Sequence, residues 1–312
     1  MEIKKICVVG GGQMGRQIAL NAAINGYQVK VYDKVPAVCD AVETWEEEYL
    51  AGRIAKGRMT EEQVAQTKVR FSVVRDLKRA AADADMVIEA VVEIYDVKAE
   101  IFKELDAIVR PDTIIATNSS YMVSSLFKNC VSNPGRLLNC HYYNPALVMK
   151  FVEVVQGPHT SPAVADAVVE FCKNCGKTPI CMKKELSGFA ANRLVSVLNA
   201  EARWLVQNGY LTYQEVDTAC EQGLGHPMGP FRLMDMTGID LTYDLMKAGM
   251  DASGEKPDCY DLIESMVKAG NLGRKTGRAS TITHKHPLTL LGFAGNILYP
   301  RPLRCNSFVF SY

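Results

Sequence analysis

The chain has 312 residues, of which 48% are hydrophobic and 22% charged, as is typical of a globular protein with two domains of ordinary size. Its thirty-five basic and thirty-five acidic residues cancel, which excludes a general electrostatic attraction to nucleic acid or to an anionic membrane. No apolar run reaches the roughly 18 residues that a membrane-spanning helix needs.

The ten cysteines are scattered, which favours a reducing compartment over a secreted disulfide framework. The single CxxC, Cys172 and Cys175, falls late in a predicted helix without a second pair of ligands, so we expect no metal there. The N-terminus runs directly into a predicted strand with no removable leader. We therefore expect a cytoplasmic protein.

The first elements form a strand, a glycine loop and a helix. Lys5–Val9 has the composition of a buried strand, Gly10–Gly15 follows it, and Arg16–Asn25 predicts a helix that ends at Gly26. The free N-terminus of such a helix faces the loop and favours negative charge, so this arrangement is typical of a phosphate site.

The positions of the glycines indicate a dinucleotide. Gly10 allows a tight turn, Gly12 lets the backbone approach a pyrophosphate, and Gly15 allows the helix to pack closely on the strand. A second predicted strand, Gln28–Tyr32, ends at Asp33, where an acidic side chain accepts hydrogen bonds from an adenosine ribose. Asp33 favours NAD over NADP, because its charge repels a 2′-phosphate. The alternative is a glycine turn with a purely structural role.

The segment 37–67 predicts an inserted helical hairpin. It is charged and helical in pattern, and it is broken near Gly57, with Arg53, Lys56 and Arg58 grouped at the break. This basic tip is either a solvated face or a clamp for an anionic substrate tail.

Further strands and helices then alternate. The predicted strands are Val69–Val73, Met86–Ala90, Thr113–Thr117, Leu137–Cys140, Phe151–Val155 and Lys177–Lys183, and the predicted helices are Asp76–Ala82, Asp96–Val109 and Ser161–Asn174. This alternation predicts an α/β fold with a mostly parallel, doubly wound, Rossmann-like sheet over residues 1–184.

From Ser187 onward only helical periods remain, which predicts an all-α C-terminal domain over residues 185–277 with a boundary near Lys184. The predicted helices are Phe189–Gln207, Tyr213–Glu221, Phe231–Met236, Ile239–Gly249 and Pro257–Ala269. Asn192 and Arg193 lie among apolar residues near the start of the first, where a polar side chain needs a partner. That partner is either a neighbouring backbone group or a substrate oxygen.

His141 and Glu153 are the candidate acid/base pair. They lie on the two strands that flank a loop containing Pro145, so pairing of these strands would bring them together. A carboxylate bonded to an imidazole fixes its tautomer and stabilises its protonated form. The alternative is a histidine that closes a strand and a solvated glutamate.

Polar residues also collect where parallel strands end, the edge at which such sheets bind ligands. Glu93 and Lys98 follow one strand, and Asn118, Ser119 and Ser120 follow the next. Ser120 is either a helix cap or, with His141 at the same edge, a substrate contact.

Seven motifs together resemble the L-3-hydroxyacyl-CoA dehydrogenases, and among them the short-chain 3-hydroxybutyryl-CoA dehydrogenases. They are Gly10-Gly-Gly-Gln-Met-Gly15, Glu89-Ala-Val-Val-Glu93, Thr117-Asn-Ser-Ser120, His141-Tyr-Tyr-Asn-Pro145 with Val152-Glu-Val154, Gly188-Phe-Ala-Ala-Asn-Arg193, Pro227-Met-Gly-Pro-Phe231 and Gly273-Arg-Lys-Thr-Gly277. The resemblance covers nearly all of residues 3–277.

The resemblance implies an NAD-binding domain, a helical domain that forms a homodimer, and a short-chain acyl-CoA substrate. It implies His141 as catalytic base, Glu153 as its partner, and Ser120 and Asn192 as contacts to the reacting oxygens. Lys56 falls where the family binds the CoA phosphates. The residues implied around the cofactor are Gly10, Gly12, Gln13, Met14, Gly15, Asp33, Glu93, Lys98, Asn118, Ser120, Asn144 and Lys275.

The chain departs from its relatives in two places. Tyr142-Tyr143 stands where they usually have Phe-Phe, and Ser119-Ser120-Tyr121 where they often have Thr-Ser-Ser. After Gly277 the composition changes abruptly into the tail 278–312, for which we have no physical account.

The sequence thus predicts NAD-dependent oxidation of short-chain L-3-hydroxyacyl-CoA, and the reverse reduction of acetoacetyl-CoA, in fatty-acid oxidation or butyrate metabolism. Two alternatives remain. One is a dehydrogenase of a polar hydroxy compound such as L-gulonate or carnitine, and the other is an inactive NAD-binding protein like the lens crystallins of this family.

Overall fold

The computed structural model describes residues 2–277, which divide into two compact units between Val195 and Ser196. The predicted tail 278–312 lies outside the described residues. The division falls within a helix, α7, whereas the change of periodicity comes a few residues before that helix begins. Each unit is described by itself below.

The first unit is built on a sheet that, within the described residues, has eight strands in the order β3-β2-β1-β4-β5-β6-β7-β8. The strands are β1 (Lys5–Val9), β2 (Gln28–Tyr32), β3 (Phe71–Val73), β4 (Met86–Glu89), β5 (Ile114–Thr117), β6 (Leu137–Tyr142), β7 (Phe151–Val155) and β8 (Thr178–Met182). All neighbours pair in parallel except β6 and β7, which confirms the mostly parallel sheet. The order reverses between β1 and β4, and sheets of this kind bind ligands beyond the carboxyl ends of the strands at such a point.

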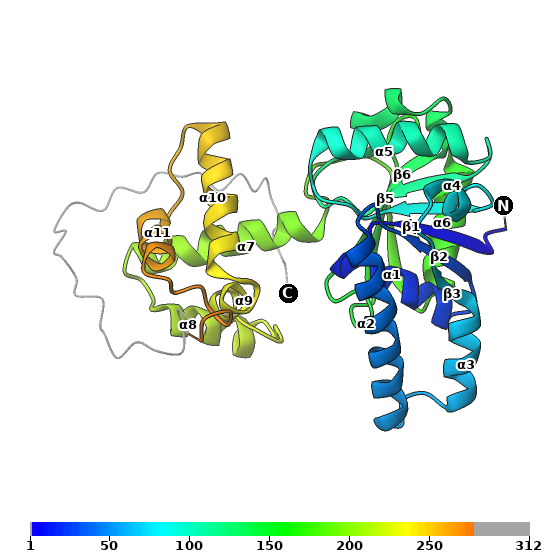
Figure 1. Cartoon of the computed structure of the whole chain (residues 1–312). Helices are drawn as coiled ribbons and strands as arrows, with labels where there is room; N and C mark the ends of the chain where they lie inside the picture. The colour runs from blue at the N-terminus through cyan, green and yellow to red at the C-terminus, as the bar shows by residue number, and fades with distance from the viewer. Residues whose placement is uncertain (1, 278–312) are drawn as a thin grey trace, which may run out of the picture. The chain divides into compact units, whose positions relative to one another are not determined.

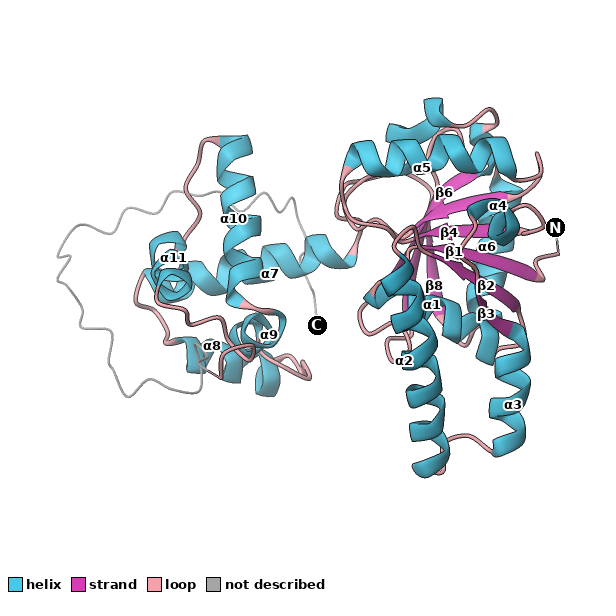
Figure 2. Ribbon diagram, viewed as in Figure 1, coloured by secondary structure: helices cyan, strands magenta, loops and turns pink. Residues whose placement is uncertain are grey.

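Helices cover both faces of this sheet (Figure 2). They are α1 (Gln13–Ile24), α2 (Pro36–Ala55), α3 (Glu61–Arg70), α4 (Leu77–Ala81), α5 (Tyr95–Ile108) and α6 (Pro162–Asn174), with the 3₁₀ turns η1 (Ser124–Cys130) and η2 (Pro134–Arg136). In β1, Ile6 and Val8 join the core beneath α1 and α6, whereas Cys7 and Val9 join the core beneath α4 and α5. Because both faces are buried, the strand is a continuous apolar run and not an alternating one.

One predicted strand starts too early. The sequence predicts a strand from Val69 to Val73, but Val69 and Arg70 end helix α3, and the strand begins at Phe71. Val69 is 81% exposed, so its β-branched side chain belongs to the outer face of a helix and not to the sheet. Here local β-propensity is overridden by the neighbouring helical turns.

The α2–α3 hairpin that the sequence predicts is confirmed, and it extends away from the sheet (Figure 1). Leu50 of α2 and Val64 of α3 share a small core with Leu20 of α1, which holds the hairpin against that helix. Thr60 caps α3 by a reciprocal capping box with Gln63. The tip between the helices carries Lys56, which is exposed.

The helical region contains α7 (Ala191–Gln207), α8 (Tyr213–Thr218), the π-helical turn η3 (Ala219–Gly223), α9 (Pro230–Thr237), α10 (Ile239–Ser253) and α11 (Tyr260–Lys268). Its core gathers one face of each long helix, including Val206, Phe231 and Ile263. Asp217 is buried and accepts hydrogen bonds from the backbone N–H groups of Phe231 and Arg232, so it caps α9 from outside the helix. Across residues 2–277, no helix is both long and apolar enough to cross a membrane.

Candidate active site

The glycine loop after β1 fits a bound dinucleotide. A Cβ on Gly10 would lie 2.6 Å from the carbonyl oxygen of Ala90, and one on Gly15 would lie 1.8 Å from the carbonyl oxygen of Gly10. At Gly12, by contrast, a Cβ would meet nothing within 4 Å. Gly10 and Gly15 are therefore required by the close packing of the protein itself, whereas Gly12 leaves open space over the start of α1. No side chain caps that helix, so its first N–H groups can bind a pyrophosphate.

Asp33 lies directly after β2 and stabilises the glycine loop by hydrogen bonds. Its Oδ2 accepts from the N–H of Gly11 at 2.8 Å, and its Oδ1 accepts from the N–H of Val35 at 2.9 Å. Each carboxylate oxygen keeps a second lone pair, so Asp33 can still accept hydrogen bonds from ribose hydroxyls. The geometry is thus compatible with the role that the sequence predicts.

His141 and Glu153 are brought together by the antiparallel pairing of β6 and β7. The strand register sets them directly opposite each other, and His141 Nδ1 lies 2.9 Å from Glu153 Oε2. On the other side of the ring, His141 Nε2 lies 3.0 Å from the hydroxyl oxygen of Ser120. The result is a hydrogen-bonded chain of serine, histidine and glutamate.

The carboxylate of Glu153 is fully buried and receives four hydrogen bonds. Oε2 accepts from His141 and from the hydroxyl of Tyr143 at 2.8 Å, and Oε1 accepts from the N–H groups of Ala190 and Ala191 at 2.9 and 3.1 Å. Burial alone would raise the pKa of Glu153, but the hydrogen bonds from His141, Tyr143, Ala191 and Ala190 outweigh it and lower the pKa.

The ionised carboxylate fixes the histidine tautomer. A carboxylate can only accept, so Nδ1 of His141 carries the proton and Nε2 is free to accept one. The Ser120 hydroxyl therefore donates to Nε2 while the imidazole is neutral. This leaves a proton acceptor at the carboxyl end of β6.

Two amide side chains hold Ser120 and His141 in place, those of Asn139, which is buried, and Asn118, which is partly buried. Asn139 on β6 accepts from the N–H of Ser124 at 2.8 Å and donates to the carbonyl of Met122 at 2.9 Å. Asn118, at the end of β5, accepts from the N–H of Tyr142 at 2.9 Å. Both side chains tie the segment after β5 to β6, so they fix the spacing between Ser120 and His141.

The loop after His141 reaches the glycine loop. Gln13 Nε2 donates to Asn144 Oδ1 at 3.2 Å, which links the start of α1 to the histidine loop. The side chain of Lys177 is largely buried, and its ammonium donates to the carbonyls of Ala146 and Met149 at 2.5 and 3.1 Å. These two bonds hold the loop in place. Two residues predicted at the cofactor, Gln13 and Asn144, are therefore in contact.

Lys98 and Glu89 form a buried ion pair, and Glu93, whose side chain is 41% exposed, joins it from the surface. The ammonium of Lys98 is 1% exposed and lies 2.7 Å from Glu89 and 3.1 Å from Glu93. Glu89 also accepts from Thr117 at 2.6 Å, and Glu93 accepts from the hydroxyl of Ser119. Burial would raise the pKa of Glu93, but the bonds from Ser119 and Lys98 lower it. Because Lys98 is enclosed by the two glutamates, it supports Glu93 and is not itself open to a ligand.

Comparison with known proteins identifies the family. The sequence profile described as "3-hydroxyacyl-CoA dehydrogenase, NAD binding domain" matches residues 5–186, and the profile "3-hydroxyacyl-CoA dehydrogenase, C-terminal domain" matches residues 188–281. The chain belongs to the 3-hydroxyacyl-CoA dehydrogenase family. It is therefore an NAD-dependent oxidoreductase, which confirms the resemblance seen in the sequence motifs and the NAD assignment.

Relatives in this family align over most of the chain. A protein of Bacillus subtilis (strain 168), "Probable 3-hydroxybutyryl-CoA dehydrogenase", is 37% identical over 89% of this chain and 96% of its own length. The mitochondrial hydroxyacyl-coenzyme A dehydrogenase of Rattus norvegicus is 34% identical over 88% of this chain and 90% of its own length. The crystal structure of (S)-3-hydroxybutyryl-CoA dehydrogenase from Ralstonia eutropha matches with a TM-score of 0.81 at 33% identity, covering 89% of this chain and 98% of that chain.

Three predicted site residues of this dehydrogenase form no side-chain hydrogen bond with the linked series of Ser120, His141 and Glu153. Asn192 lies in the first turn of α7, directly after the two backbone N–H groups that bind Glu153, and no hydrogen bond joins its side chain to Ser120 or His141. Lys275 belongs to the helical unit, where its ammonium binds Asp240 at 2.7 Å. Lys56 lies at the hairpin tip. Their roles toward ligands stay predictions.

Sequence reasoning missed two supporting groups in this dehydrogenase. Glu89 belongs to one of the seven family motifs, but the sequence alone assigns it no function. A carboxylate at the end of the apolar run Met86–Glu89 indicates a buried charge, and a buried charge requires a partner. The sequence marks Tyr143 only as a departure from the Phe-Phe of its relatives, because sequence spacing does not reveal that its hydroxyl reaches Glu153.

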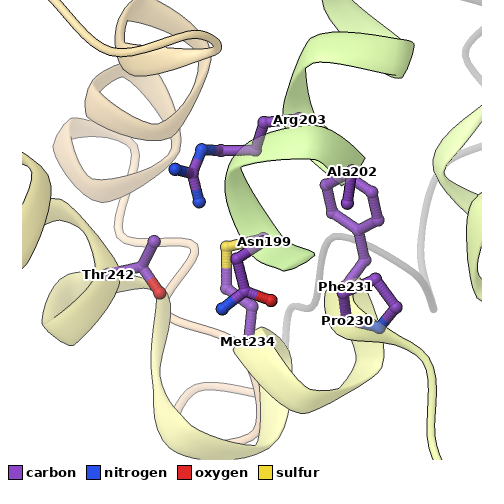
Figure 3. A pocket seen from close by; sticks show the side chains of 7 residues that line it. All are labelled: Asn199, Ala202, Arg203, Pro230, Phe231, Met234 and Thr242. Atoms are coloured by element: carbon purple, nitrogen blue, oxygen red, sulfur yellow. The ribbon is translucent and has the colours of Figure 1, made fainter. Parts of the chain in front are cut away.

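A separate hollow lies in the helical unit of the dehydrogenase, among α7, α9 and α10 (Figure 3). Its lining residues are Asn199, Ala202, Arg203, Pro230, Phe231, Met234 and Thr242. None of the predicted site residues lines it, so we do not assign it to the reaction. Cys172 and Cys175 are both buried at the end of α6, and the described part of the chain holds no cluster suited to a metal ion.

Proposed function

We propose that this chain oxidises short-chain L-3-hydroxyacyl-CoA to 3-ketoacyl-CoA with NAD, and reduces acetoacetyl-CoA in the reverse direction. The observation that carries the proposal is the hydrogen-bonded chain from Ser120 through His141 to Glu153. The names of the aligned relatives, which include 3-hydroxybutyryl-CoA dehydrogenases from two bacteria, support the substrate class.

In this proposal His141 is the acid/base group. Nε2 takes the proton of the C3 hydroxyl, which makes the oxygen electron-rich enough for the C3–H bond to break and a C=O bond to form. Bound NAD supplies the acceptor for the hydride that leaves C3. Glu153 stabilises the imidazolium that results, and Ser120 holds the C3 oxygen near Nε2. In the reverse direction the imidazolium returns its proton to the ketone oxygen.

The hairpin supports a CoA thioester as the substrate. Trp45 stacks on Tyr49 one turn later in α2, with ring centroids 5.4 Å apart, and the guanidinium of Arg16 lies 4.8 Å from the centre of the Trp45 ring. Arg53 continues the same face of α2, and Lys56 follows at the tip. Aromatic rings beside basic groups suit an adenine and its phosphates.

A substrate panel tests the assignment. NADH consumption is followed with acetoacetyl-CoA, free acetoacetate and dehydrogulonate at equal concentrations. We expect fast turnover with the thioester alone. Turnover only with the free compounds would move the chain to the polar-substrate dehydrogenases, and no turnover with any of the three, despite measured NADH binding, would favour a binding protein.

A variant tests the acid/base role. His141→Gln removes the proton acceptor while keeping a side chain of similar size, so we expect turnover to be lost and NAD affinity to stay within about twofold. Equal loss of turnover and NAD binding would indicate a structural histidine.

We also propose a homodimer that forms through the helical unit and resides in the cytoplasm. The exposed apolar side chains of this unit include Val197 of α7 at 71%, Leu241 of α10 at 47% and Leu245 of α10 at 49%. A second copy of the chain could bury such side chains. Light scattering should give twice the mass of the chain, whereas a monomer at micromolar concentration would contradict the dimer, and cell fractionation tests the location.

A further inference from the structure

The hydroxyl of Tyr143 shares a carboxylate oxygen with the histidine. It donates to Glu153 Oε2 at 2.8 Å, the same atom that lies 2.9 Å from His141 Nδ1. The Tyr143 ring also lies against the imidazole, with centroids 4.6 Å apart, and packs on Phe151 at 5.4 Å. Two aromatic contacts thus fix the direction in which the hydroxyl points.

This second donor changes what Glu153 can do for His141. A hydrogen bond to a carboxylate oxygen stabilises its negative charge and reduces the attraction that the oxygen exerts on a neighbouring proton. The imidazolium form of His141 gains less from Glu153 than it would from an oxygen with one donor. Because Glu153 is fully buried and His141 nearly so, this competition takes place with little screening by water.

Tyr143 stays a donor throughout the neutral range. Burial raises its pKa, and the bond to Glu153 and the charge of Glu153 raise it further. The groups that face the cluster are the Ser120 hydroxyl, the Tyr121 hydroxyl and the backbone N–H groups of Ala190, Ala191 and Asn192 at the start of α7. Among the contacts of the described residues, no lysine or arginine binds Glu153, so Tyr143 is the neutral side chain that moderates its charge.

We propose that Tyr143 is a positioning residue which, through Glu153, weakens His141 as a base and so sets the pH range of the reaction. The consequence is a neutral, proton-accepting histidine at lower pH than the His–Glu pair alone would allow. Oxidation of the alcohol therefore persists to lower pH, and reduction of the ketone, which needs the protonated imidazole, declines at lower pH. The inference rests on the proposed acid/base role of His141.

The test is the pH dependence of kcat/KM in Tyr143→Phe, measured in both directions. Phenylalanine keeps the ring contacts and removes only the hydroxyl. In the plot of kcat/KM against pH, we expect the acidic limb for oxidation and the basic limb for reduction to shift together to higher pH. The expected shift is about 0.5–1 pH unit, because one hydrogen bond to a charged group is lost. Tyr142→Phe is the matched control, because the Tyr142 hydroxyl lies 4.0 Å from Cys172 Sγ and makes no bond to Glu153.

A second readout needs no turnover. In NMR titrations of the free protein, the imidazole signal of His141, identified by its loss in His141→Gln, should titrate at higher pH in Tyr143→Phe than in the parent and in Tyr142→Phe. If neither the pH profiles of kcat/KM nor the NMR titration of His141 shifts in Tyr143→Phe, the role of Tyr143 is overturned and the proposed function stays intact. Parent-like turnover of His141→Gln would instead overturn the proposed function, and this inference with it.

Discussion

Replacing Glu153 by glutamine directly tests whether the carboxylate fixes the tautomer of His141. Four donors face the carboxylate in the structure, namely Nδ1–H of His141, the Tyr143 hydroxyl and the N–H groups of Ala190 and Ala191. A glutamine has one acceptor oxygen, and its amide nitrogen can only donate. Two of the four donors must therefore face an NH₂ group in the variant.

The structure decides which two. The backbone N–H groups of Ala190 and Ala191 cannot change into acceptors, whereas His141 can move its proton to Nε2 and the hydroxyl of Tyr143 can rotate. We therefore expect the glutamine oxygen to face α7 and its NH₂ to face the imidazole. Nδ1 then accepts, and Nε2, the atom beside Ser120, carries the proton.

This wrong tautomer blocks the base. In serine-protease triads the equivalent change lowers kcat by about 10⁴-fold, and we expect a loss of about 10³–10⁴-fold in alcohol oxidation here. KM for the thioester should change little, because Glu153 is fully buried and therefore not open to the substrate. Four hydrogen bonds to a charged carboxylate become weaker bonds to a neutral amide, which should also lower the free energy of unfolding by about 2–4 kcal/mol.

The assay combines steady-state kinetics in both directions with urea unfolding. Glu185→Gln is a matched control, since Glu185 accepts from the hydroxyl of Ser124 and the N–H of Ser125, at 2.7 and 2.8 Å, and does not contact His141. A loss of less than tenfold in kcat for Glu153→Gln, with a folded protein, would refute the tautomer reasoning.

Three further predictions concern the cofactor, the buried ion pair and pH. Asp33→Asn should reduce the preference for NAD over NADP by about tenfold, measured as the ratio of the two dissociation constants, and an unchanged ratio would count against ribose binding. Lys98→Met leaves the buried carboxylate of Glu89 without its cation and should cost about 3–5 kcal/mol in urea unfolding. The partly exposed pair of Lys30 and Asp83 provides its control, since Lys30→Met should cost about 1 kcal/mol, and equal costs would contradict the burial argument. The pKa of Glu153 lies below its ordinary value of 4.5, so its ionised form stabilises the fold fully above pH 4.5 and this contribution disappears as pH falls through the lower folded value. The difference in unfolding free energy between the parent and Glu153→Gln should therefore shrink below pH 4.5, and a constant difference would show that ionisation of Glu153 does not contribute.

The sequence alone determined the features that depend on local pattern. Apolar runs such as Lys5–Val9 mark strands covered on both faces, and the glycines at 10, 12 and 15 mark a loop in which a Cβ has no room or a ligand needs access. The pairing of His141 with Glu153 could also be predicted, because two strands joined by a short loop pair as neighbours. The ends of helices and strands were predicted less accurately. Val69, for example, was placed in a strand, but it lies in helix α3.

Only the tertiary structure decided how the charges are balanced. Ala190 and Ala191 bind Glu153 across 37 and 38 residues of sequence, and Lys98 lies between Glu89, which is fully buried, and Glu93, a pairing that no local pattern reveals. The hydroxyl of Tyr143 reaches Glu153 because β6 and β7 pair in one register and because aromatic neighbours turn the ring. Hydrogen bonds of this kind depend on positions within a few tenths of an ångström, which the packing of the whole domain sets and sequence spacing does not.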